Sequence, residues 1–136
     1  NMHTAAAWLT FDERATAGLG RDELALGLEG FAHVLRNLAP VFCLCDARDL
    51  GADAQVRSPS TGKPTVYLYD MVPGGIGLAE RVFEARDRIV AACLEAVRGC
   101  GCENGCPSCV GPQAERHSPA KRAAAVLLER VAGPRG

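Results

Sequence analysis

Four cysteines lie within ten residues, in the segment Cys100-Gly-Cys102-Glu-Asn-Gly-Cys106-Pro-Ser-Cys109. The spacing C-x-C-x3-C-x2-C lets four thiolates converge on one cation with little bending of the chain. Zn²⁺ binds four cysteine sulfurs tetrahedrally, and such sites are closed and structural. Gly101 and Gly105 suit a backbone that wraps around a metal, because glycine accepts positive φ. We therefore predict a zinc site with the ligands Cys100, Cys102, Cys106 and Cys109.

Other uses of the cysteines stay open. The chain has seven cysteines, and a secreted domain would usually pair them and leave one over. No secretory signal is visible, so reduced thiols and a metal are favoured over disulfides. An iron–sulfur cluster is a further alternative, although C-x-C-x3-C differs from the usual cluster spacing. Cys43 and Cys45 could hold a second metal, but burial is favoured for them and for Cys93.

A glycine-rich loop is a second candidate site. Pro73-Gly74-Gly75-Ile76-Gly77 joins an expected strand to an expected helix, where exposed N–H groups and the helix dipole can bind phosphate. No lysine follows the glycines, so a tight turn with close helix–sheet packing is favoured. The alternative is that Gly74, Gly75 and Gly77 contact a nucleic-acid phosphate.

Basic residues lie on both sides of the cysteines. Arg81 and Arg88 share a face of the preceding helix, and Lys121 and Arg122 follow the cysteine segment. Acidic residues are interleaved with them, which favours a solvated, salt-bridged surface. Contacts to DNA phosphates are the alternative. His33 is expected to form a hydrogen bond with a nearby loop rather than to bind a metal.

The elements that position these residues follow from periodicity and turn residues. Strands are expected over residues 4–11 and 64–69, with another near 55–57. Helices are expected over 21–38, 78–97 and 119–131, and Pro40 is expected to stop the first of them. Residues 41–45 are either a strand or a buried helical turn. The predicted class is α+β: a small antiparallel sheet of about three strands packed by three main helices, with the four-cysteine loop between the last two.

Composition indicates one globular domain. The chain has 136 residues, 48% of them apolar and 23% charged, which excludes a disordered chain. No apolar run approaches the roughly 20 residues of a membrane span. The net charge of −1 is no nucleic-acid footprint by itself, so DNA contact would be local or shared with other parts of a larger protein.

Several segments together resemble one protein family, the C-terminal zinc-binding domain of DEAD/DEAH-box helicases of the mitomycin-repair-factor-A type. The cysteine segment through Val110 is similar to the metal motif of that family, and residues 69–80 are similar to its Tyr-Asp-x3-Gly-Gly-x-Gly motif. Residues 4–10, 29–33, 45–51 and 61–64 resemble further blocks, so the resemblance spans nearly the whole chain. Ala52 departs from the pattern, because many members have a second glycine after Asp-Leu-Gly.

The resemblance implies that residues 1–136 are a single zinc-binding C-terminal domain, a piece of a larger, cytoplasmic bacterial helicase that acts in ATP-dependent DNA repair. It implies a structural Zn²⁺ as cofactor, the motor domains of the same polypeptide as partners, and DNA as a partner of the full-length protein. The module would stabilise the helicase and assist its engagement of DNA. No membrane partner is expected.

The chain is not expected to be an enzyme by itself. It has no G-x4-G-K-[ST] motif to bind the phosphates of ATP, so we expect neither ATP hydrolysis nor unwinding from it alone. Two other hypotheses remain. One is a thiol or redox enzyme, which would need accessible cysteines of lowered pKa. The other is a self-sufficient nucleic-acid-binding zinc finger, which would show salt-dependent DNA affinity.

Overall fold

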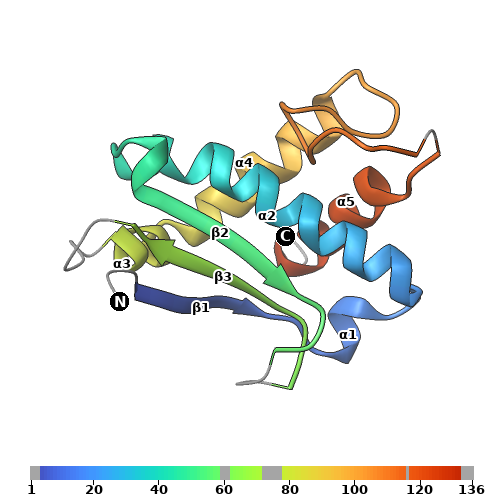
Figure 1. The fold of residues 1–136 in the computed structure, drawn as a ribbon, viewed down its shortest axis with the longest axis horizontal. Helices are drawn as coiled ribbons and strands as arrows, with labels where there is room; N and C mark the ends of the chain where they lie inside the picture. The colour runs from blue at the N-terminus through green and yellow to red at the C-terminus, as the bar shows by residue number, and fades with distance from the viewer. Residues whose placement is uncertain (1–3, 59–61, 72–77, 116, 133–136) are drawn as a thin grey trace.

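The computed structural model describes residues 4–58, 62–71, 78–115 and 117–132. Helices α2, α4 and α5 pack together, and α2 lies against the sheet (Figure 1). This arrangement confirms the predicted α+β class, with the cysteine segment between α4 and α5. The elements, in order, are β1 (Thr4–Thr10), α1 (Glu13–Thr16), α2 (Arg21–Cys43), the 3₁₀ helix η1 (Ala47–Asp49), β2 (Leu50–Gln55), β3 (Thr65–Asp70), α3 (Leu78–Glu84), α4 (Arg86–Gly99) and α5 (Ala120–Ala132).

The sheet has the strand order β1-β3-β2, and both strand pairs are antiparallel. Its central strand β3 is the segment with the strongest β-forming sequence. Side chains alternate between the two faces of a strand, so Val66 and Leu68 are buried while Tyr67 and Tyr69 are half-buried. The buried face packs against the helices and forms the base of the core.

The strand expected near residues 55–57 lies earlier than predicted. It is β2, Leu50–Gln55, and its sequence Leu-Gly-Ala-Asp-Ala-Gln is poor in β-forming residues. Pairing with β3 over six consecutive residue pairs makes this segment a strand. Tertiary pairing thus outweighs local propensity here.

The prediction that Pro40 stops the first long helix is wrong. Helix α2 continues to Cys43 with Pro40 inside it. Proline removes one helical hydrogen bond, but Ala39, Pro40 and Cys43 are all buried, so packing holds the last turn in place. The helix ends at Leu44, which adopts a left-handed conformation (φ 52°, ψ 44°) and donates its N–H to the Pro40 carbonyl. Of the two alternatives for residues 41–45, the helical turn is confirmed for residues 41–43, but it is not fully buried, because Val41 is 66% exposed.

The helix expected over residues 78–97 is divided in two. Ala85 has φ −94° and ψ 10°, which ends α3 and begins α4. Its N–H still bonds to the Arg81 carbonyl at 3.1 Å, and its own carbonyl accepts from Ile89 at 2.9 Å. The two helices have different neighbours: α3 contacts the strands β1 and β3 as well as α2, whereas α4 packs on α2 and α5. The last helix, α5, lies within one residue of its predicted bounds.

Helices α2 and α5 approach each other closely at two glycines of α2. A Cβ atom added at Gly27 would lie 2.8 Å from Cβ of Ala123, and one at Gly30 would lie 3.3 Å from Cβ of Ala124. Glycine at these positions lets the two backbones approach each other. The rings of Phe11 and Phe31 fill the space toward β1, edge to face with centroids 5.5 Å apart. In the described part of the chain, no helix is long and apolar enough to cross a membrane.

Candidate metal centre

The four predicted ligands converge in the structure. Their sulfur atoms all lie within 4.8 Å of one another. Sγ of Cys100 is 3.5 Å from that of Cys102 and 3.3 Å from that of Cys106, and Sγ of Cys109 is 3.4 Å from that of Cys102 and 3.8 Å from that of Cys106. Among the described His, Cys, Asp and Glu side chains, these four cysteines form the group that could hold a metal ion.

These separations fit a tetrahedral zinc ion. Four sulfurs bound to zinc at about 2.3 Å stand about 3.8 Å apart along each edge of the tetrahedron. A disulfide would bring two sulfurs to about 2.05 Å, and all four cysteines are free thiols in the structure. The donor set, four thiols and no carboxylate, matches closed structural zinc sites.

The loop backbone explains how four cysteines so close in sequence can face inward. The amides of Cys109 and Gly111 both donate to the Cys106 carbonyl, at 3.0 and 2.9 Å, and this closes a turn around the last two cysteines. Gly105 and Gly111 have positive φ, 152° and 91°. Gly105 was predicted to do so, whereas the same prediction for Gly101 is wrong and Gly111 was missed.

The cysteines are unequally buried. Cys109 is fully buried, whereas Cys100, Cys102 and Cys106 are half-buried. Burial raises the pKa of the Cys109 thiol to about 12. A thiol with so high a pKa ionises at neutral pH only with a cation beside it, which is how a bound metal ion would deprotonate it.

Helix α2 holds the second pair of cysteines through one carbonyl. The oxygen of Pro107 accepts a hydrogen bond from Nε2 of His33 at 3.0 Å and another from Nδ2 of Asn37 at 2.9 Å. A carbonyl can only accept, so Nε2 of His33 carries a proton in this hydrogen bond. The expected bond from His33 to a nearby loop is confirmed. Asn37 was missed, although its position four residues after His33 places it on the same helix face.

Helix α5 holds the first pair of cysteines. Nζ of Lys121 donates to the Cys100 carbonyl at 2.8 Å and also to the Cys102 carbonyl. An ion pair between Arg98 and Glu129 also links α4 to α5. The loop is thus attached to α2 on one side and to α5 on the other.

The other predicted phosphate contacts have partners within the chain. Nη1 of Arg81 lies 3.4 Å from the Cys43 carbonyl, and the Arg88 guanidinium lies 5.8 Å from the centre of the Phe42 ring. Arg122 pairs with Glu23 at 2.7 Å. The structure does not gather these residues into one site with the cysteines. Gly74, Gly75 and Gly77 lie outside the described residues, and contact with phosphate stays a prediction for all of them.

The remaining cysteines form no metal site with other described residues. Cys43 and Cys93 are buried, and Cys45 is half-buried. Burial raises the pKa of Cys93 to about 12, and burial is also the main cause of the raised pKa values of Cys43 and Cys45. These thiols pack as apolar groups, as expected.

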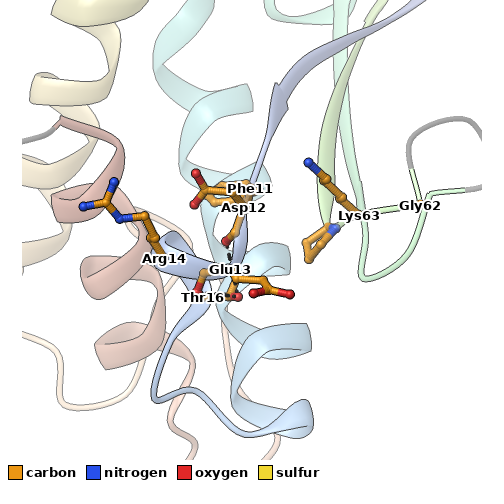
Figure 2. A pocket seen from close by; sticks show the side chains of 8 residues that line it. Phe11, Asp12, Glu13, Arg14, Thr16, Gly62 and Lys63 are labelled. Carbon is orange, nitrogen blue, oxygen red and sulfur yellow. Dashed lines mark hydrogen bonds between the residues drawn. The ribbon is translucent and has the colours of Figure 1, made fainter.

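A cavity of about 570 Å³ lies beside α1 (Figure 2), and none of the cysteines lines it. Residues of α1 and the chain before β3 line it, including Glu13, Arg14 and Lys63. Asp12 caps α1 by accepting a hydrogen bond from the Ala15 amide at 3.0 Å. In Figure 2 the guanidinium group of Arg14 points away from Lys63, so these two cations do not converge on one ligand atom.

Comparisons with known proteins point to one family. The sequence model of the MrfA Zn-binding domain matches residues 31–110. The "Uncharacterized ATP-dependent helicase YprA" of Bacillus subtilis (strain 168) is 41% identical over 114 residues, which cover 84% of this chain and 15% of that protein. The chain therefore spans about 15% of the length of this curated helicase relative.

A solved structure and an archaeal protein extend the comparison. The crystal structure of the DUF1998 helicase MrfA bound to DNA matches 85% of this chain and 15% of its own chain, with 38% identity and a TM-score of 0.76. The "Uncharacterized protein MJ1572.1" of Methanocaldococcus jannaschii is 29% identical over 86 residues, which cover 61% of this chain and 77% of that protein.

Proposed function

The chain belongs to the family of MrfA Zn-binding domains, and we propose that it is the structural zinc module at the C-terminus of an ATP-dependent DNA repair helicase. The observation that carries this proposal is the convergence of four cysteine sulfurs where α4 ends and α5 begins. The helicase relatives named above support a motor on the same polypeptide. The motor domains are then the first partner of this module.

The proposed ligands are Cys100, Cys102, Cys106 and Cys109. Four thiolates fill the coordination sphere of zinc and leave no position for water or substrate, so the metal has a structural role. The site joins α4 to α5 and is attached to α2 through Pro107, so zinc binding contributes directly to the folding free energy of the helical layer. Such a module stabilises the helicase without taking part in ATP hydrolysis.

We further propose that the module assists DNA engagement in the full-length protein. The relative solved with DNA supports this part of the proposal. Arg122 is the favoured contact, because its side chain is 70% exposed and its ion pair with Glu23 lies at the surface. Such a pair contributes little to stability, so Arg122 can turn to a phosphate at small cost.

Metal analysis and thiol protection test the zinc assignment. We expect one zinc per purified chain and slow alkylation of all four loop cysteines, which becomes fast after chelation. Cys45, half-buried and outside the loop, is the internal reference and should react equally with and without zinc. Rapid alkylation of the loop cysteines in a metal-free, folded chain would instead support a thiol or redox enzyme.

Salt-dependent DNA binding tests the second part. We expect this chain alone to bind DNA weakly. In the full-length helicase, Arg122→Gln should reduce by about 1 the slope of the logarithm of the DNA-binding constant against the logarithm of the salt concentration, because one phosphate contact is lost. The matched control is Arg48→Gln, which also removes a surface ion pair, here with Asp46. Strong, steeply salt-dependent binding by this chain alone would favour the self-sufficient zinc finger.

A further inference from the structure

We infer that Lys121 is a positioning residue of the zinc site, which fixes the backbone of the first two ligands through its ammonium group. Its two described hydrogen bonds both end on carbonyls of cysteine ligands, Cys100 and Cys102. This inference rests on the proposed zinc ligation. It assigns Lys121 a role other than the DNA contact that the sequence suggested.

The position of Lys121 in its helix indicates a specific role. It is the second residue of α5, where the positive end of the helix dipole disfavours a cation. Its ammonium group, however, reaches the C-cap carbonyl of α4, the Cys100 oxygen. That end of a helix favours a cation, so one side chain connects the end of α4 to the start of α5.

The chemistry of the site needs positive charge nearby. Four thiolates and one Zn²⁺ carry a net charge of −2, and partners that orient the ligands stabilise such centres. Different side chains hold the two halves of the cysteine loop. His33 and Asn37 hold the part of the loop that contains Pro107, whereas the ammonium group of Lys121 holds the part that contains Cys100 and Cys102.

The unmodified protein offers a direct test, because the chain has two lysines, Lys63 and Lys121. Lys63 is exposed and distant in sequence from the cysteines, whereas Lys121 is half-buried. Acetylation with an N-hydroxysuccinimide ester, followed by mass spectrometry, gives the rate at each lysine. We expect Lys121 to react slowly in the zinc-loaded chain and much faster after chelation, while the rate at Lys63 stays the same. A rate at Lys121 that does not change on chelation would overturn the inference.

Variants test the consequence for the metal. Lys121→Met should weaken zinc affinity by roughly 10- to 100-fold, the usual effect of losing a partner that orients a ligand, and should therefore release zinc faster to an excess of chelator. Lys121→Arg keeps the charge and the donors, so it should restore slow release. Arg130→Met is the matched control, because Arg130 lies on the same helix and donates to two carbonyls outside the loop, those of Ala15 and Ala17. It should release zinc as the wild type does. Wild-type release from Lys121→Met would refute the positioning role.

A general loss of stability gives a different result. It would lower the melting temperatures of the zinc-loaded and metal-free chains equally, whereas a positioning role lowers mainly that of the zinc-loaded chain. If Lys121→Met does not fold, the acetylation rates of the wild type still decide the question. A wild-type chain that binds no zinc contradicts the proposed function itself, whereas a zinc-loaded chain with an unprotected Lys121 contradicts only this inference.

Discussion

Gly30 provides a sharp test of how closely α2 packs against the cysteine loop. A methyl group added there would lie 2.8 Å from Cβ of Val110 and 3.3 Å from Cβ of Ala124. Ordinary contacts between such atoms are 3.4–4 Å, so Val110 must move by ~0.6 Å or more to restore van der Waals contact. Val110 directly follows Cys109, and its displacement therefore reaches a proposed zinc ligand.

Gly30→Ala has two opposing effects on the free energy of unfolding. Alanine in place of glycine stabilises a helix by about 1 kcal/mol, whereas overpacking a core destabilises it by about 1–3 kcal/mol. The net loss of stability is therefore roughly 0–2 kcal/mol. Gly99→Ala, near the end of α4, is the control, because nothing lies within 4 Å of the added methyl group. It should gain up to about 1 kcal/mol.

A third glycine separates the effect on stability from the effect on zinc. A methyl group at Gly27 would lie 2.8 Å from Cβ of Ala123 and 3.2 Å from Cδ1 of Leu127, and both neighbours belong to α5 rather than to the loop. Gly27→Ala should therefore destabilise the chain without moving Val110. Gly30→Ala should destabilise the chain and also accelerate zinc release.

Urea unfolding of the zinc-loaded chains and zinc transfer to a chelator measure the two quantities. Gly30→Ala should be less stable than Gly99→Ala by about 1–3 kcal/mol, and its zinc release should be faster than that of Gly27→Ala. The reasoning is refuted if Gly30→Ala and Gly99→Ala are equally stable. It is also refuted if Gly27→Ala and Gly30→Ala release zinc at the same rate.

Three further predictions concern single side chains. Cys106→Ser should abolish stoichiometric zinc binding and lower the melting temperature to that of the chelated wild type, as metal analysis and calorimetry would show. Asn37→Ala removes one of two donors to the carbonyl between the last two ligands and should cost about 1 kcal/mol in urea unfolding. Glu23 has a pKa lowered by the Gly20 amide and then by Arg122, so its stabilising contribution is present above the unfolded pKa of 4.5 and is lost as the pH falls through the folded value. Glu23→Gln should flatten this part of the acid-unfolding curve, and an unchanged curve would contradict the assignment.

The sequence was a good guide where one local signal dominates. Cysteine spacing predicted the metal site, and the run of β-forming residues predicted β3. The stripe of leucines predicted most of α2. In each case the residue types that form the element are also the ones that pack or bind, so pattern and structure agree.

The sequence was a poor guide where tertiary contacts decide. The segment that forms β2 has weak β propensity and becomes a strand only by pairing with β3. Pro40 stays helical because Ala39, Pro40 and Cys43 are packed in the core. The hydrogen bonds from His33 and Asn37 to the Pro107 carbonyl join residues 70 or more positions apart. Those from Lys121 to the carbonyls of Cys100 and Cys102 join residues about 20 positions apart. Such contacts leave no periodic pattern in a single sequence. The bond from His33 to a nearby loop was expected, but Asn37 was missed, and Lys121 was expected at a solvated surface with DNA contact as the alternative.

The composition of the cysteine loop explains why a metal is needed at this point in the fold. Between Cys100 and Ser118, Val110 is the one large aliphatic or aromatic side chain, and burial of apolar area is the main source of stability for an ordinary loop. The ends of α4 and α5 nevertheless have to be held at this loop. Four thiolates on one cation supply that stabilisation, while donors from α2 and α5 fix the loop on either side. Loss of the metal should therefore loosen the contacts among all three helices.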